Sequence, residues 1–325
     1  MEIVCFYYID WYYQSILTAG KQRMNLRDLE YLVAVEQQRH FHKAAECCHV
    51  SQPTLSGQLK KLEEELGVLL VERSNRQVTM TEVGKAIAAQ ANKVLAEVRV
   101  IRDIAQTFHD PMAGALHLGL IPTLAPYLLP LIMPALKQHY PKLKLWLHEY
   151  QTTVLLDKLH RAELDVLILA LPVETDEFAE LNLFAEPFQL AVPRAEPLAN
   201  QTIISLGDLS QREMLLLEEG HCLRGQALEV CFMAGATENS GFHASSLETL
   251  RHMVGEGMGM TLMPELAVPG KRSNKDPIRY LRFRNPPPTR RIGMLYRRGS
   301  YREAGFKKIQ QLIQQTMPDT VRRVK

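Results

Sequence analysis

The sequence lacks a strong charge of either sign and lacks long apolar runs. Its 38 lysines and arginines nearly balance its 36 aspartates and glutamates, leaving a formal charge of +2, which is too small to indicate a nucleic-acid partner. No apolar run reaches the roughly 18 residues of a membrane-spanning helix, which argues against an integral membrane protein. A hydrophobic content of 46% and a charged content of 23% are typical of an ordinary folded domain. Any function must therefore be sought in local patterns.

Cysteine is also scarce, and the five cysteines of the 325-residue chain are Cys5, Cys47, Cys48, Cys222 and Cys231. So few cysteines exclude a disulfide-stabilised scaffold, and no pair has the C-x-x-C spacing of a zinc site. We therefore expect no metal and no cofactor. A reducing cytoplasm is the expected location.

The first 23 residues differ in composition from the rest of the chain. Aromatic residues crowd together there, but the first cation is Lys21, and Glu2 and Asp10 are acidic, whereas a signal peptide needs an early basic region. We expect residues 1–23 to be a disordered leader without membrane attachment, because the basic face of a membrane-surface helix is missing. The chain is long enough for two or three compact units.

A helix-turn-helix is predicted directly after this leader. Apolar residues recur at helical spacing from Leu26, and a second short helix follows. Ser51 is a good N-cap, and Pro53 lies in the first helical turn, where a missing N–H does no harm. A third helix is therefore expected from about Ser51 to Leu66, ending at Gly67.

The third helix carries the residues that are expected to read DNA. It is the second helix of the helix-turn-helix motif, and that helix enters the major groove. Its exposed early residues must therefore be short hydrogen-bonding side chains that reach base edges. Residues 69–81 alternate around a turn and predict a wing whose cations meet phosphates or the minor groove. The candidate DNA-binding residues are Ser51, Gln52, Pro53, Thr54, Ser56, Gln58 and Lys60 on the helix and Arg73 and Arg76 in the wing. Residues 24–81 would form this winged domain, whose 7 Lys and Arg are outnumbered by 8 Asp and Glu.

A long helix is predicted after the wing. Apolar residues recur along it at steps of 4 and 3, which is the heptad seam of a paired helix. The seam consists of Ile87, Ala91, Val94, Val98, Ile101, Ala105 and Phe108. Residues 82–110 are therefore expected to be a linker and dimerisation helix, and the alternative is a seam packed against its own domain. Asp110-Pro111 and Gly114 mark a domain boundary.

From residue 115 the pattern changes to strands that alternate with amphipathic helices. The predicted strands are Leu116–Ile121, Leu143–Leu147, Val166–Leu171, Met214–Leu217, Met260–Met263 and Ile292–Tyr296. Such alternation predicts a parallel-rich α/β sheet. Because about 200 residues are generous for one small sheet, residues 115–317 are expected to form two subdomains with a cleft between them.

Three motifs in the predicted winged domain resemble those of LysR-type transcriptional regulators: Leu29-Glu-Tyr-Leu32, Ser51-Gln-Pro-Thr-Leu-Ser56 and Leu62-Glu-x-Glu-Leu-Gly67. The resemblance covers residues 24–108. It implies an α/β protein with an N-terminal winged helix-turn-helix, a long linker helix and a two-subdomain effector domain like the periplasmic binding proteins. It also implies a DNA-binding regulator rather than an enzyme, with double-stranded DNA as its partner and a homodimer or homotetramer as the acting form.

A second candidate site surrounds Cys222. The segment Gly220-His-Cys-Leu-Arg-Gly-Gln226 places this cysteine between a histidine and an arginine, after an apolar strand and where a helix should begin. Cations and a helix N-terminus both favour the thiolate, which is the form that attacks peroxide. Cys231 follows nine residues later, and a sulfenic acid at Cys222 can condense with such a second thiol. A lone buried cysteine is more commonly inert packing.

Further phrases resemble the peroxide-sensing, OxyR-type members of the LysR family, among them His117-Leu-Gly-Leu-Ile-Pro-Thr123 and Ser246-Leu-Glu-Thr-Leu-Arg251. By that resemblance Cys222 is the peroxidatic cysteine and Cys231 the resolving one, in a hydrogen-peroxide sensor that controls antioxidant genes and contacts RNA polymerase. The resemblance also implies a peroxide pocket that is shaped by Thr123, Thr152, His221 and Arg224.

The sequence leaves alternative functions open and departs from the OxyR-type pattern at one residue. Most of the family senses a small metabolite in the effector-domain cleft, so a metabolite is the alternative signal. A cysteine hydrolase that uses Cys222 is disfavoured because no orienting third residue is evident. Arg224 can pair with Glu218 or Glu219 instead of facing peroxide. Gly225 stands where OxyR-type proteins usually carry aspartate, which bears on peroxide reactivity and on switching.

Overall fold

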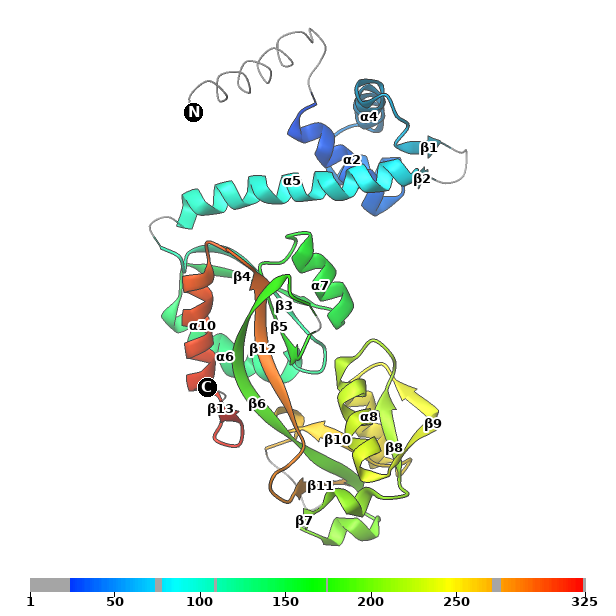
Figure 1. The fold of residues 1–325 in the computed structure, drawn as a ribbon, viewed down its shortest axis with the longest axis vertical. Helices are drawn as coiled ribbons and strands as arrows, with labels where there is room; N and C mark the ends of the chain where they lie inside the picture. Colours follow the sequence, from blue (N-terminus) through cyan, green and yellow to red (C-terminus); the bar gives the residue numbers. More distant parts are fainter. Residues whose placement is uncertain (1–23, 74–77, 108–109, 174, 271–275, 324–325) are drawn as a thin grey trace, which may run out of the picture. The chain divides into compact units, whose positions relative to one another are not determined.

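The computed structural model describes residues 24–73, 78–107, 110–173, 175–270 and 276–323. The chain divides into two compact units, residues 1–101 and 102–325, and Figure 1 labels most of their helices and strands. The predictions for the leader 1–23, for Arg76 and for Phe108 lie outside the described residues. Along the described parts of the chain, no helix combines the length and the apolar character needed to span a bilayer.

Three short helices build the first unit: α2 (Leu26–Gln38), α3 (Phe41–Cys47) and α4 (Gln52–Leu66). Asn25 and Asp28 form a capping box at the start of α2, and the Ser51 hydroxyl accepts the N–H of Thr54 at the start of α4. Gly67 ends α4 in the left-handed conformation, with φ +69°, which glycine adopts without steric cost. The predicted third helix and both of its ends are thus confirmed.

A small apolar core decides which face of α4 meets solvent. Leu55, Leu59 and Leu62 of α4 are buried in one cluster with Leu32 and Val35 of α2. Because the three leucines recur at steps of 4 and 3, they occupy one side of the helix. The polar first turn of α4 is left to face outward.

A β-hairpin follows α4 where the wing was predicted. β1 (Val71–Arg73) pairs antiparallel with β2 (Val78–Met80). Glu63 of α4 is buried, and its carboxylate accepts the N–H groups of Leu70 at 2.9 Å and of Val71 at 3.1 Å. This carboxylate fixes the hairpin to the helix, a role that the sequence did not reveal.

The predicted long helix is α5 (Glu82–Thr107). The Thr81 hydroxyl accepts the N–H of Gly84 at 2.9 Å and so caps its first turn. Along the predicted seam, Val94 is 38% exposed and Ile101 is 67% exposed. The outer part of the seam is therefore an apolar stripe that is open to solvent in the single chain.

The second unit is an α/β fold, as predicted. Its described residues form a nine-stranded sheet in the order β4-β3-β5-β12-β6-β11-β7, with β10 and β13 also paired to β6. These strands are β3 (Gly114–Leu120), β4 (Leu143–Glu149), β5 (Val166–Leu171), β6 (Phe178–Pro193), β7 (Ile203–Ile204), β10 (Thr261–Pro264), β11 (Ile278–Phe283), β12 (Thr289–Arg297) and β13 (Arg322–Arg323). β8 (Glu213–Leu217) and β9 (Thr237–Ala244) form a separate parallel pair. The helices are α6 (Ala125–His139), α7 (Thr152–His160), α8 (Cys222–Ala234), α9 (Leu247–Gly255) and α10 (Glu303–Thr316), and the 3-10 turns are η1 (Pro197–Asn200), η2 (Leu206–Leu209) and η3 (Glu265–Ala267).

The long strand β6 joins two subdomains. Its first part pairs with β12, ending with Pro187 opposite Thr289. Its second part pairs with β10 and β11, beginning with Phe188 opposite Pro264. Figure 1 shows β6 passing from one half of this unit into the other. The two subdomains predicted from the sequence are therefore present.

The sequence did not predict β6, and the expected parallel-rich sheet is only partly correct. β3 runs parallel to β4 and β5, but β6 runs antiparallel to β10, β11, β12 and β13. The physical reason for the omission is Pro187, because proline lacks a ladder donor and normally argues against a strand interior. Here proline lies where the strand passes between subdomains.

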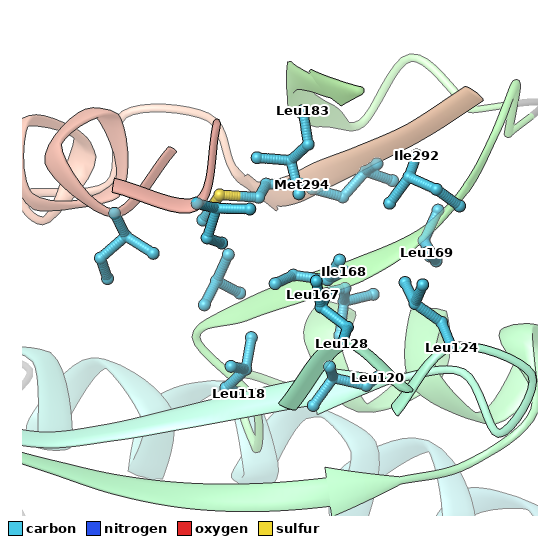
Figure 2. Close-up of a cluster of buried hydrophobic side chains, with 14 of the residues drawn as sticks. Leu118, Leu120, Leu124, Leu128, Leu167, Ile168, Leu169, Leu183, Ile292 and Met294 are labelled. Atoms are coloured by element: carbon cyan, nitrogen blue, oxygen red, sulfur yellow. The ribbon is translucent and has the colours of Figure 1, made fainter. Parts of the chain in front are cut away.

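Each subdomain has its own core. In the first, side chains from β3, β5 and β12 meet those of α6, and Figure 2 shows Leu120, Leu167 and Ile292 among them. The second contains Leu216 of β8 and Val230 of α8. α8 is thus built mainly on the second core, with its first residue placed where the subdomains meet.

Candidate functional site

The two candidate redox cysteines, Cys222 and Cys231, lie on α8, which begins after the loop that follows β8. Gly220 in that loop has φ +92°, a left-handed conformation that favours glycine, and a Cβ at this position would lie 2.4 Å from Oε1 of Gln151. His221 is the N-cap residue and Cys222 is the first helical residue. Because Gln151 is the N-cap residue of α7, this contact brings together the starts of two helices from different subdomains.

The two cysteines occupy different environments on one helix. Cys222 is half-buried and packs against the first core, whereas Cys231 is 2% exposed and belongs to the second core. Burial raises the pKa of Cys231 to about 11, and the negative charge of Glu238 adds to that rise. Cys231 is therefore a neutral thiol near neutral pH. Both cysteines are free in this structure.

Thr123 and Thr152 follow the adjacent parallel strands β3 and β4, whose carboxyl ends share one edge of the sheet. Thr152 is the first residue of α7, and its hydroxyl is buried without a hydrogen-bond partner in the described part of the chain. The Thr123 hydroxyl is buried too and accepts from Nη1 of Arg290 at 3.2 Å, which leaves its own hydrogen to donate. A buried hydroxyl without a partner is uncommon in proteins. This edge can therefore offer hydrogen bonds to a small polar ligand.

Arg224 is held by a carboxylate that the sequence did not indicate. Its guanidinium forms two hydrogen bonds with Glu238 of β9, one of them 2.9 Å from Nη2 to Oε2, and Nη1 also donates to the carbonyl of Leu217 at 3.1 Å. Hydrogen bonding with Glu238 raises the pKa of Arg224, and the same bonds lower the pKa of Glu238. Arg224 therefore pairs with a carboxylate, as considered from the sequence, but the partner is Glu238 and not Glu218 or Glu219.

His221 completes the set of pocket residues expected from the sequence. Its side chain is 4% exposed, with Nε2 4.0 Å from Oε1 of Glu218. It makes no capping hydrogen bond to the helix that it precedes. The structure thus brings the starts of α7 and α8 together, with Thr152 on one and His221 on the other. The guanidinium of Arg224, in contrast, is turned to β9.

Two further polar residues near this site were missed in the sequence. Gln226 lies one turn after Cys222 on the same helix face, and its side-chain oxygen is buried without a partner in the described residues. Arg290 is fully buried, pairs with Glu186 at 2.8 Å and donates to both the hydroxyl and the carbonyl of Thr123. The offset of four from Cys222 was a usable signal for Gln226. Arg290 lies 167 residues from Thr123, and no local pattern points to it.

In this form of α8 the two cysteines cannot form a disulfide. The helix is continuous from Cys222 to Ala234, so nine residues separate the cysteines by roughly 13 to 14 Å along the axis. A disulfide tolerates a Cα separation of only about 4.4 to 6.8 Å. A bond between them therefore requires that α8 unwinds or bends.

The first turn of α4 presents a polar surface to solvent. Its exposed residues are Ser51, Gln52, Pro53 and Thr54, and Ser56 and Gln58 in the next turn are half-buried. The hydroxyls of Ser51 and Thr54 lie 2.8 Å apart and hydrogen-bond to each other. Because these two hydroxyls are engaged in capping, Gln52 is the exposed side chain of this turn with the longest polar reach.

The candidate cations have different surroundings. Lys60 is exposed and lies 3.8 Å from Glu64 one turn later, which offsets part of its charge. Arg73 ends β1, but its side chain lies outside the described residues, as does all of Arg76. Over the described ranges, no group of three or more His, Cys, Asp or Glu side chains is arranged to hold a metal ion.

A winged helix-turn-helix followed by a two-subdomain α/β unit defines a DNA-binding transcription regulator rather than an enzyme. Residues 26–85 match the bacterial regulatory helix-turn-helix proteins of the lysR family. Residues 109–318 match the LysR substrate binding domain. The chain belongs to the LysR family of transcription regulators.

Within that family the chain is similar to proteins named OxyR. It is 50% identical over 294 residues to the DNA-binding transcriptional dual regulator OxyR of Escherichia coli strain K12, which covers 90% of this chain and 96% of that protein. It is 52% identical over 277 residues to the hydrogen peroxide-inducible genes activator of Dickeya chrysanthemi, which covers 85% of this chain and 90% of that protein. A solved variant of full-length OxyR from Pseudomonas aeruginosa has a TM-score of 0.72 at 39% identity, covering 90% of this chain and 95% of that chain.

Proposed function

We propose that this protein is a transcription regulator that senses hydrogen peroxide through Cys222 and is switched by a disulfide between Cys222 and Cys231. The fold and the family make it a DNA-binding regulator. A relative that is 52% identical is named for genes that hydrogen peroxide induces. The signal is therefore peroxide, and the response is a change in how the protein acts at its DNA sites.

The observation that carries this proposal is a free thiol at the start of α8, which lies against the start of α7, where a buried hydroxyl has no partner in the described residues. Cys222 opens α8, where the unpaired N–H groups of the first turn favour a negative charge. The starts of α7 and α8 are in contact through Gln151 and Gly220. Next in the chain to Gln151, the Thr152 hydroxyl is buried without a partner in the described residues. A ligand as small as peroxide, with two oxygens that accept hydrogen bonds, suits such a site.

The first chemical step is attack of the Cys222 thiolate on one peroxide oxygen. The S–O bond forms as the O–O bond breaks, so the cysteine becomes a sulfenic acid and the second oxygen leaves as hydroxide, which takes a proton to become water. Thr123 and Thr152 donate hydrogen bonds to the peroxide oxygens, and His221 protonates the departing hydroxide.

The second step joins the two cysteines. The Cys231 sulfur attacks the sulfenic sulfur of Cys222, the S–S bond forms, the S–O bond breaks, and the oxygen leaves as water with the thiol proton. Over both steps the two thiols lose two electrons and one peroxide molecule gains them. Because the cysteines are roughly 13 to 14 Å apart along α8, this step requires local unfolding of the helix.

The output of the switch is at DNA. In this proposal Gln52 and its neighbours on α4 contact base edges, while Lys60, Arg73 and Arg76 contact phosphates. The protein acts in the cytoplasm as a homodimer or homotetramer that is joined in part through the seam of α5. It controls antioxidant genes and contacts RNA polymerase.

The test is a count of thiols after brief exposure of the reduced full-length protein to micromolar peroxide. Alkylation and mass spectrometry should show the loss of two thiols and one peptide pair cross-linked between Cys222 and Cys231. The Cys222→Ser variant should lose none, and the Cys231→Ser variant should stop at a sulfenic acid that dimedone traps. The Cys47→Ser variant is the matched control and should behave as the wild type. Retention of every thiol in the wild type would overturn the proposal and favour a metabolite in the cleft as the signal.

A further inference from the structure

The first turn of α8 is clamped to the β8–β9 pair by one ion pair. Arg224 binds the Glu238 carboxylate through two hydrogen bonds and the Leu217 carbonyl through a third. The side chains of Arg224 and Glu238 are only 17% and 22% exposed. A bidentate, charge-assisted pair of this kind is among the stronger polar interactions in proteins, and partial burial protects it from screening by salt.

We propose that Glu238 is a positioning residue that holds α8 in its reduced form by clamping Arg224, and that release of this clamp limits formation of the Cys222–Cys231 disulfide. This inference rests on the proposed function. It assigns to β9 a role in the timing of the switch that is separate from the reaction with peroxide.

The position of Arg224 supports this assignment. It is the third residue of α8, between the two cysteines and two positions after Cys222. Any unwinding that brings Cys222 toward Cys231 must displace the first turn, and with it the guanidinium. The two hydrogen bonds with Glu238 must then be broken before the second chemical step is completed.

The position of Glu238 relative to Cys231 acts in the same direction. The negative charge of Glu238 is the second cause, after burial, of the raised pKa of Cys231. It therefore disfavours the thiolate that attacks the sulfenic sulfur. Removal of the charge would favour both the unwinding of α8 and the attack itself.

Glu238 lies on β9 and does not belong to the polar edge that carries Thr123 and Thr152. Its partners are Arg224 and, at 3.5 Å from its Oε1, Nδ1 of His243 on the same strand. Its neutralisation should therefore leave the reaction of Cys222 with peroxide nearly unchanged. The expected signature is a change in the second step alone.

The experiment compares the two steps in the reduced full-length protein and its Glu238→Gln variant. Quenched-flow samples give the sulfenic acid by dimedone trapping and the disulfide by the loss of two alkylatable thiols. We expect an unchanged rate of sulfenic acid formation and disulfide formation about tenfold faster, the order of effect for charge-assisted hydrogen bonds. Redox titration should show a disulfide potential more negative by about 30 mV, which is a tenfold change in the two-electron equilibrium constant.

Two further variants separate the clamp from general damage to the fold. Glu238→Asp keeps the charge and should recover most of the wild-type rate of disulfide formation. Glu229→Gln removes the same charge from an exposed position of α8 and should change neither step. Equal rates of disulfide formation in wild type and Glu238→Gln would overturn the clamp while leaving peroxide sensing intact. Absence of any sulfenic acid or disulfide in the wild type would instead overturn the proposed function.

Discussion

At the scale of single residues, Gln52 is the side chain of α4 best placed to read a base. It is exposed at the first helical position, beside hydroxyls that are engaged in capping. We expect Gln52→Ala to relax preference at one base position by about 1–3 kcal/mol and to leave the salt dependence of binding unchanged. Fluorescence anisotropy on paired DNA sequences at several salt concentrations measures both quantities.

Arg76→Ala is the contrasting variant for that experiment. A phosphate contact carries no base information, so this change should weaken binding to all sequences alike and reduce the salt slope by about one. If Gln52→Ala weakened all sequences equally, α4 would not read DNA at this residue. If Arg76→Ala altered sequence preference and left the slope untouched, the wing would be wrongly assigned.

The buried thiol of Cys231 predicts a pH dependence at the same scale. Its pKa is raised from 9.0 to about 11, chiefly by burial, so the folded helix favours the protonated thiol. The stability linked to this group is fully present below pH 9 and is lost as the pH rises toward about 11. In reduced Cys222→Ser protein, alkylation of Cys231 should be slow at pH 8 and should accelerate steeply toward pH 11.

The exposed Cys47 is the internal reference for this measurement. Mass spectrometry after short alkylation pulses resolves the two sites in one sample. A Cys231 that reacts at pH 8 as fast as Cys47 would show that α8 opens readily in the reduced protein, contrary to expectation.

What the sequence could reveal about single residues depended on how near their partners lie along the chain. Ser51 caps its own helix, so its role was predictable from three neighbouring positions. Arg224 pairs with Glu238, which lies 14 residues away on a strand that the sequence did not predict. Arg290 reaches Thr123 across 167 residues. Such contacts are set by how the strands assemble, which no local pattern records.

At the scale of elements, the resistance of α8 to unwinding should set the speed of the switch. Gly225 weakens this helix because glycine costs about 1 kcal/mol relative to alanine. A Cβ at Gly225 would meet no heavy atom within 4 Å, so larger residues fit. We expect Gly225→Asp to slow disulfide formation about fivefold once sulfenic acid is present, since a carboxylate near the helix start adds favourable charge.

Gly225→Ala separates the two contributions, because it restores helix propensity without the charge. Amide hydrogen exchange over residues 220–235 measures the protection of α8 directly, in the reduced and oxidised protein. Identical protection in both states, with the disulfide verified by mass, would contradict the unwinding of α8.

The predictability of the elements followed their local chemistry. α4 was predicted to within a residue because Ser51, Pro53 and Gly67 mark its ends. The strand β6 was not predicted, because Pro187 interrupts it and because residues that are uncommon in strands, such as Ala, Glu and Asn, outnumber its Phe and Val residues. The mixed direction of the sheet follows from β6 as well, and it could not be inferred while that strand was missing.

At the scale of the whole molecule, the seam of α5 predicts how chains associate. Val98 lies midway along it, between the exposed Val94 and Ile101. Val98→Asp would place an unpaired charge in a paired-helix interface, at a cost of about 3–5 kcal/mol. We expect a smaller assembly in sedimentation of the reduced full-length protein at concentrations where the wild type is associated.

Glu97→Ala is the control, since Glu97 is the exposed neighbour outside the seam. It should leave the assembly unchanged. If Val98→Asp sediments as the wild type does, the chains associate through another surface, and the alternative of a seam that packs within its own chain gains support.

One consequence concerns how the response ends. Cys222 packs against the core of one subdomain and Cys231 lies within the core of the other, so α8 fills space in both. In the proposed switch, unwinding of α8 on oxidation would leave unfilled volumes in both cores, and each is unfavourable. The packing of the two cores would therefore favour the reduced form over the oxidised form. Once a cellular dithiol cuts the disulfide, the helix returns by its own packing energy. The response to peroxide would thus last only as long as the disulfide remains intact.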